Sequence, residues 1–215
     1  MEDTETYTKL IKDPTKANET KMNTLLLKIK REGQFDDALY FSLRSTDAIS
    51  PRMYGLIKIH KVGFPVRPIV SFSGSATLQL SRYLSDILSP VLGQTEFTVR
   101  NSMEFVDCIR TVKWRPGDVM ISFDVVSLFT NIPVPKALRI VKAKITNDPT
   151  FIHRTKLSIS NFMILLEHCL ESSNFSFRGN FYRQSFVCPM GSPCNFYGYR
   201  KHDDGGHRMS NIQLQ

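Results

Sequence analysis

At 215 residues the chain is long enough for one domain or two small ones, and its hydrophobic content of 41% is enough for a buried core. Lys and Arg total 28 against 20 Asp and Glu, so the net charge of +8 favours a polyanionic partner, nucleic acid before a membrane surface, although charge alone also fits an ordinary basic protein. We expect no membrane span, because no apolar run approaches the roughly 18 residues required, and no secretory signal peptide, because the start is acidic and polar.

The cysteine content favours a reducing compartment. Four cysteines in a chain of this length are too few and too scattered for a disulfide framework: Cys108, Cys169, Cys188 and Cys194. We therefore expect an intracellular protein, in the nucleus or cytoplasm, that is not secreted.

The first third of the chain predicts helices and one hairpin. Residues 1–20 are polar and indicate a loose or helical lead-in. Apolar residues at i, i+3, i+4 and i+7 then predict an amphipathic helix that stops at Gly33: Met22, Leu25, Leu26 and Ile29. Two strands are expected at 53–59 and 66–71, joined by a turn over 60–65.

The remaining elements follow in mixed order. Helical spacing recurs at 80–88, 105–109, 138–145 and 162–170, with Asn101 as an expected cap and Pro135 in an expected first turn. A strand is expected from Val119, and a second hairpin at 175–182 around Arg178-Gly179-Asn180. Helices and strands in this irregular order predict an α+β fold.

Cations alternate with apolar residues in the first predicted hairpin, which contains Lys58, Lys61 and Arg67. If the hairpin bends over a pocket, these side chains can meet a triphosphate, because Lys supplies a point charge and Arg a planar fork for phosphate oxygens. A two-stranded ribbon with solvated lysines explains the same pattern taken alone.

One carboxylate, Asp124, lies in the apolar run that begins at Val119, and the aromatic Phe129 follows it five residues later. A lone Asp at the end of a buried strand is unfavourable unless a cation meets it, and a divalent metal is the usual partner in a chain that handles phosphates. A strand-end cap or a salt bridge also explains Asp124, and a core position also explains Phe129.

These segments resemble the reverse transcriptase of Penelope-like retroelements over about residues 5–194. Tyr54-Gly-Leu-Ile-Lys-Ile-His-Lys61 followed by Arg67-Pro-Ile-Val-Ser71 is similar to the fingers region of that family, and Tyr7–Thr15 with Tyr40–Leu43 is similar to its lead-in. The resemblance implies a right-hand polymerase fold, truncated before the motif C hairpin and the thumb. It divides the chain into a helical lead-in, the fingers, a partial palm and an irregular tail: 1–50, 51–118, 119–194 and 195–215.

The resemblance also implies roles for single residues. Asp124 would bind both catalytic Mg²⁺ ions, with the Val125 carbonyl assisting one of them. Phe129 would pack under the sugar of the incoming deoxynucleotide and exclude a 2′-hydroxyl. The phosphates of that nucleotide would contact the hairpin cations Lys58, Lys61 and Arg67.

The segment Tyr182–Pro193 resembles the second palm motif, in which Gln184 and Gly191 belong to a loop against the nucleotide and template. Glycine lets the backbone approach closely there. The family usually has Gly where this chain has Val187. Because a β-branched residue does not easily take a glycine-only conformation, the loop is expected to be distorted.

The further carboxylates of the family, an aromatic-x-Asp-Asp hairpin, have no counterpart in this sequence. The pair Asp203-Asp204 follows Lys201-His202 and precedes two glycines, which do not build a strand. Phosphoryl transfer needs two ions to neutralise the attacking and leaving oxygens, and one Asp does not hold both. We therefore expect an RNA-directed DNA polymerase fragment that is catalytically incomplete.

Three functions stay open at this point. The first is the reverse transcriptase fragment, a nucleotidyltransferase by family, with RNA template, DNA primer and deoxynucleotide triphosphates as partners. The second is a non-catalytic module that binds RNA or an RNA–DNA duplex through phosphate contacts. The third and weakest is a small zinc-binding protein, for which metal analysis is the test. Its ligands would be Cys188, Cys194, His202 and His207, whose spacing departs from the usual zinc patterns.

Overall fold

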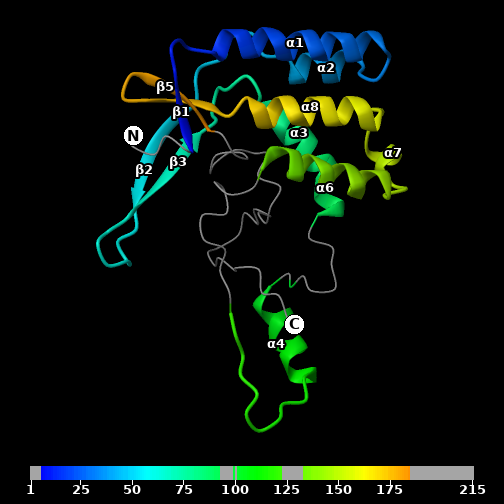
Figure 1. The fold of residues 1–215 in the computed structure, drawn as a ribbon. Coiled ribbons are helices and arrows are strands. Elements are labelled where there is room, and N and C mark those ends of the chain that lie inside the picture. The colour runs from blue at the N-terminus through cyan, green and yellow to red at the C-terminus, as the bar shows by residue number, and fades with distance from the viewer. Residues whose placement is uncertain (1–5, 93–98, 100, 123–132, 185–215) are drawn as a thin grey trace.

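The computed structural model describes residues 6–92, 99, 101–122 and 133–184. Helices and one five-stranded mixed sheet make up this part of the chain, which confirms the predicted α+β class. Figure 1 shows the strands gathered at one end of a layer of helices. The helices are α1 (Thr15–Arg31), α2 (Asp37–Leu43), α3 (Leu78–Leu88), the 3₁₀ turn η1 (Ser89–Val91), α4 (Ser102–Thr111), α6 (Val134–Thr146), α7 (Phe151–Arg154) and α8 (Ile159–Glu171). The strands are β1 (Tyr7–Leu10), β2 (Arg52–Ile57), β3 (Val66–Ser71), β4 (Asn174–Phe177) and β5 (Asn180–Gln184).

The stop predicted for α1 is confirmed in detail. The Gly33 N–H donates to the Lys30 carbonyl at 2.9 Å, and the Gln34 N–H donates to the Ile29 carbonyl at 3.2 Å. These two bonds satisfy carbonyls that the last turn of a helix leaves unpaired, and they require a residue with positive φ between them. Gly33 takes φ of 75°, which glycine adopts without steric strain.

The helical layer buries one large apolar core. It contains the apolar faces predicted for the helix before Gly33 and at 80–88, 138–145 and 162–170, but not the face predicted at 105–109. Its most deeply buried members come from α1, α3, α6 and α8: Met22, Leu26, Leu80, Leu84, Leu88, Ile145, Phe162, Leu165 and Leu166. Because these helices bury their faces against one another, the strands at the end of the layer contribute little to this core.

The sheet has the order β1-β5-β4-β2-β3. The hairpin β2–β3 is antiparallel, and so are β4–β5 and β1–β5. The two hairpins meet through one parallel contact, in which Arg52 lies opposite Ser176 and the Ser176 N–H donates to the Pro51 carbonyl at 2.7 Å. A second, smaller core covers part of one face of the sheet and centres on Val70, Phe72 and Phe175.

The predicted turn of the second hairpin is confirmed. Two residues, Arg178 and Gly179, connect β4 to β5 with φ of 48° and 75°. Positive φ at both positions is the type I′ geometry that matches the twist of a two-residue hairpin.

Two expectations about strands were wrong. Residues 7–10 are expected from the sequence to be loose or helical, but they form β1 because β5 pairs with them, from Tyr7 opposite Gln184 to Leu10 opposite Phe181. The strand expected from Val119 is absent over 119–122, where Val119, Met120 and Ile121 are exposed and pair with no strand of the described sheet. A strand needs a neighbour for its backbone hydrogen bonds, and local sequence does not reveal that neighbour. Residues 123–132 lie outside the described part.

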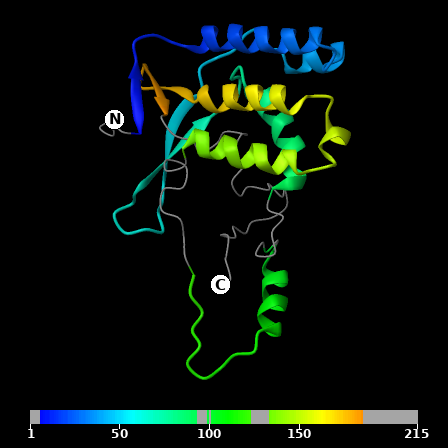
Figure 2. The same cartoon turned by 45° about the vertical axis from the view of Figure 1, so that its right-hand side comes forward.

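Helix α4 is held by local signals. The Asn101 side chain accepts a hydrogen bond from the Glu104 N–H at 2.9 Å, as the predicted cap requires. No residue of α4 is buried. Both ribbon views place α4 and the segment after it apart from the helical layer (Figures 1 and 2).

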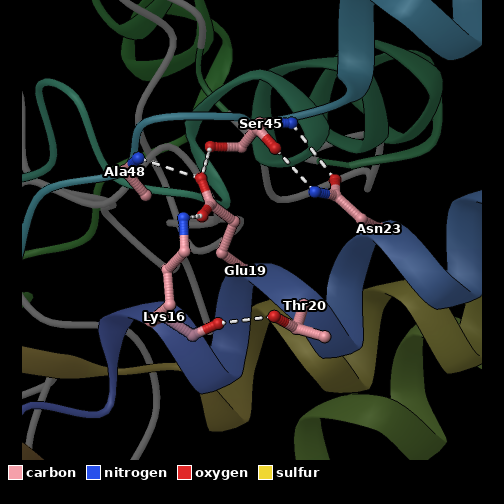
Figure 3. A network of polar contacts seen from close by, with 6 residues as sticks. All are labelled: Lys16, Glu19, Thr20, Asn23, Ser45 and Ala48. Carbon is pink, nitrogen blue, oxygen red and sulfur yellow. Dashed lines mark hydrogen bonds and ion pairs between the residues drawn. The ribbon is translucent and has the colours of Figure 1, made fainter.

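A buried carboxylate ties α1 to the segment that leads into β2. Glu19 is 3% exposed, and its two oxygens accept hydrogen bonds from Lys16 Nζ at 2.7 Å, Ser45 Oγ at 2.8 Å and the Ala48 N–H at 2.9 Å (Figure 3). Asn23, one turn further along α1, exchanges two bonds with the Ser45 backbone. The hydrogen bond from Lys16 is the main cause that lowers the pKa of Glu19.

Removal of this carboxylate is expected to destabilise the protein. Glu19→Ala should lower the free energy of unfolding by about 2–4 kcal/mol, because the half-buried Ser45 hydroxyl and the Ala48 N–H lose their acceptor. A lowered folded-state pKa means that the stabilisation is present above the ordinary pKa of 4.5 and is lost as the pH falls through the lowered value. Denaturant melts should therefore show the wild type and Glu19→Gln converging below pH 4.5. The exposed Glu171→Gln is the control, and an equal effect from it would contradict the assignment.

A buried histidine lies between α8 and α1. His168 is 4% exposed, and its Nε2 has no hydrogen-bond partner among the described residues. Burial lowers the pKa of His168 to about 4, the charge of Lys21 adds to the effect, and the Asn18 backbone opposes it. The ring is therefore neutral at pH 7 and packs as an uncharged part of this helix pair.

This histidine should make stability depend on pH. Between about pH 6.5 and 4 the unfolded chain binds a proton at His168 that the folded chain does not, so the free energy of unfolding falls with pH by at most about 3 kcal/mol. In denaturant melts across this pH range, the free energy of unfolding of His168→Leu should not show this fall. The exposed His153→Leu should retain it, and identical pH profiles for the wild type and His168→Leu would disprove the account.

Candidate functional site

The predicted hairpin cations lie on β2–β3 and its turn. Leu56 lies opposite Arg67, and the Lys58 N–H donates to the Pro65 carbonyl at 3.0 Å, which continues the same register. Lys58 and Arg67 are therefore diagonal neighbours on one face of the ribbon, a position where backbones lie about 7–8 Å apart. The structure thus brings together two of the three cations that were predicted to contact phosphate.

The third cation, Lys61, lies in the turn. The Lys61 N–H donates to the Lys58 carbonyl at 3.1 Å, and the Phe64 N–H donates to the Lys61 carbonyl at 3.1 Å, so two successive tight turns reverse the chain. Gly63, with φ of 76°, permits the second of them. Lys61 is exposed, whereas Lys58 and Arg67 are half-buried.

Along the sequence, no carboxylate lies near these cations. Between Asp47 and Asp86 the chain has no Asp or Glu, and none of the five described strands contains one. The ion pairs found among the described residues do not include Lys58, Lys61 or Arg67. Because none of the ion pairs in the described part of the chain neutralises it, the hairpin can present its positive charge to solvent and to anions.

Gln184 lies on the other face of the sheet. Across β4 and β5, Phe175 lies opposite Tyr182, and Gln184 is two residues further on the same face. Phe175 belongs to the small core together with Val70, whereas Arg67 points to the opposite face of β3. Gln184 is buried, and its N–H donates to the Ser173 carbonyl at 3.0 Å. The structure therefore does not bring Gln184 together with the hairpin cations.

The remaining predicted site residues lie outside the described part of the chain: Asp124, Val125, Phe129 and Gly191. The same holds for the distorted loop expected at Val187, for Asp203-Asp204 and for the four zinc candidates Cys188, Cys194, His202 and His207. Their roles stay predictions from the sequence.

No metal site is present among the described residues. Nowhere in that part of the chain do three His, Cys, Asp or Glu side chains gather as a metal ion would require. The adjacent acids Asp36 and Asp37 have local partners, because Asp36 accepts from the Leu39 N–H at 2.8 Å and Asp37 contacts Lys30 at 3.1 Å. The described residues therefore offer no donor set for the expected Mg²⁺.

Two further basic residues, Arg52 and Arg183, join the predicted cations on one face of the sheet. Arg52 lies opposite Ser176, which lies opposite Phe181, and Arg183 is two residues from Phe181 on the same face. Arg52 is on the face of β2 that also carries Lys58. A signal for them was present, since strand segments with cations and no acids recur at 52–71 and 174–184, but only the pairing of β2 with β4 places them on one surface.

Comparisons with known proteins return no relative. No family model matches the chain, and no curated protein and no solved structure matches it. Of the helices in the described ranges, none combines the length and the apolar character that crossing a membrane requires.

Proposed function

We propose that the chain is the fingers and first palm segment of a reverse transcriptase of the Penelope-like type, and that it binds nucleic acid without extending it. The observation that supports this most is the hairpin β2–β3, which carries Lys58 and Arg67 side by side on one face. Half-buried cations on a β-ribbon with no acid in its sequence suit the regularly spaced phosphates of a nucleic acid backbone.

In this proposal the elements divide as a right-hand polymerase would require. The hairpin β2–β3 and α3 belong to the fingers, and α6, α8 and the hairpin β4–β5 belong to the palm. Asp124 and the Val125 carbonyl would supply part of a magnesium site, whose ions would activate the primer hydroxyl and neutralise the leaving phosphate. Among the described residues themselves, no three His, Cys, Asp or Glu side chains gather as a metal ion would require.

A non-catalytic module for RNA or RNA–DNA duplex is the alternative, and the same hairpin favours it. This alternative requires only the cations Lys58, Lys61 and Arg67, whereas the polymerase requires carboxylates in addition to Asp124. The sequence contains no aromatic-x-Asp-Asp segment to provide them. Both proposals predict binding without extension, and they differ in whether Asp124 would hold a magnesium ion.

Binding should depend on salt and on the hairpin cations. We expect the double substitution Lys58→Ala/Arg67→Ala to weaken binding of an RNA–DNA duplex and to reduce the slope of log affinity against log salt by about two, one for each lost phosphate contact. Fluorescence anisotropy over a series of salt concentrations measures both quantities. Lys28→Ala/Arg31→Ala removes the same charge at the far end of α1 (Figure 1) and should leave the slope nearly unchanged. Equal losses in the two double variants would show that only net charge matters.

Primer extension tests catalysis. With Mg²⁺, an RNA template, a DNA primer and deoxynucleotides, we expect no extended product from the 215-residue chain, because its sequence has too few catalytic carboxylates. An active polymerase added to the same mixture confirms that the template and primer are competent. Extension by the wild type that Asp124→Asn abolishes would contradict the proposal of an incomplete enzyme.

A further inference from the structure

One face of the sheet combines aromatic rings with cations. We call it the open face. The register assigns to it alternate residues of each strand, and the side chains used here are Arg52, Tyr54, Lys58, Arg67, Phe181 and Arg183. Tyr54 is 46% exposed, Arg52 and Arg183 are exposed, and Phe181 is half-buried.

The two aromatic rings are spaced across the sheet. Tyr54 is on β2 and Phe181 on β5, with β4 between these strands. Arg52 is the neighbour of Tyr54 along the face of β2, and Arg183 is the neighbour of Phe181 along the face of β5. Each ring therefore has a guanidinium beside it, and no strand adds a carboxylate that would repel an anion.

The opposite face of the sheet and the edge strand β3 are less suited to binding a ligand. The opposite face carries the small core of Val70, Phe72 and Phe175. Strand β3 is at the edge of the sheet, and Lys58 and Pro65 form a hydrogen-bonded pair across the β2–β3 hairpin. Hydrogen-bonded and non-hydrogen-bonded pairs alternate in an antiparallel ladder, so Pro68, opposite Gly55, is in a non-hydrogen-bonded pair and its backbone points away from β2. A proline there offers no N–H to an added strand, which disfavours binding of an extended peptide along β3.

We propose that the open face binds single-stranded nucleic acid, with bases stacked on Tyr54 and Phe181 and phosphates paired with Arg52, Arg67 and Arg183. This rests on the proposed function and narrows its ligand from nucleic acid in general to unpaired strands. The faces of bases within a duplex are covered by their neighbours, so exposed rings on a sheet contact only unstacked bases. Arginine beside each ring adds charge for the phosphate that follows the base.

The experiment compares ligands first. Fluorescently labelled U20 RNA, T20 DNA and a 20-base-pair RNA–DNA duplex are titrated with the full chain at 150 mM salt. We expect both single strands to bind more tightly than the duplex. The two single-stranded arms show whether the 2′-hydroxyl matters. Duplex binding equal to or tighter than single-strand binding would overturn the proposal, and so would preference for anionic vesicles over all three.

Variants then test the rings. Tyr54→Ala and Phe181→Ala should each weaken U20 binding roughly 5- to 150-fold, whereas Tyr54→Phe should leave it close to wild type because the ring remains. Phe41→Ala, which removes a ring of 60% exposure from α2, is the matched control and should not change binding. Loss of binding from Phe41→Ala equal to that from Tyr54→Ala would refute a role for the open face.

Folding and stacking are checked separately. Tyr54→Leu keeps an apolar side chain on the strand, so its melting temperature should equal that of the wild type. Because it lacks the ring, it should bind U20 more weakly than the wild type does. Tyr54→Trp should bind, and bases stacked on the indole should quench its fluorescence; unchanged fluorescence at saturation would contradict stacking at this position.

The outcomes distinguish this inference from the proposed function. If Lys58→Ala/Arg67→Ala weakens binding but the aromatic variants do not, bases do not stack on the open face, and the proposed function of binding nucleic acid stands. If the aromatic variants weaken binding and the hairpin variant does not, the proposed phosphate contacts of Lys58 and Arg67 fail, and the stacking of bases on Tyr54 and Phe181 stands with Arg52 and Arg183 as its cations.

Discussion

The arrangement of charge in this protein depends on one short parallel contact. Where the chain enters β2, the Pro51 carbonyl accepts the Ser176 N–H at 2.7 Å, and Arg52 lies opposite Ser176. Without this contact the sheet would divide into the three strands β1, β5 and β4 and the two-stranded ribbon β2–β3, and an isolated two-stranded ribbon is only marginally stable in water. With it, cations from residues 52–67 and 178–183 share one sheet.

The helical layer supports that contact from both sides of the junction. Glu19 and Asn23 of α1 hold the Ser45–Ala48 segment that leads to Pro51, and Asn18 of the same helix donates to the Asn174 side chain at 2.7 Å, at the start of β4. Buried polar groups with satisfied hydrogen bonds specify one geometry, because any shift leaves a donor or acceptor unpaired. The apolar core supplies most of the stability, and these polar contacts determine where the sheet lies.

The resulting surface separates residues that a polymerase site would place together. Lys58 and Arg67 lie on the open face, while Gln184 is buried on the other face, the one that carries Phe175 and Tyr182. Residues that the family resemblance would gather around one nucleotide are therefore divided between two faces. The binding proposed for this surface needs only cations and rings, whereas phosphoryl transfer needs several carboxylates in one place.

The sequence by itself determined the elements that local patterns specify. The helices with apolar spacing, the stop at Gly33, the Asn101 cap, both hairpins and the positive-φ turn at Arg178-Gly179 depend on neighbours a few residues away, so they could be predicted. The cations Lys58, Lys61 and Arg67 could also be identified from their alternation, but their relation to Gln184 could not. Only the tertiary structure decided that Tyr7–Leu10 is a strand, that Val119–Met120–Ile121 is not, and that Arg52, Tyr54, Phe181 and Arg183 share a face. Each of these depends on a backbone hydrogen-bond partner more than 100 residues away or on the absence of one among the described strands, and pairing at that range leaves no periodic signal in the chain.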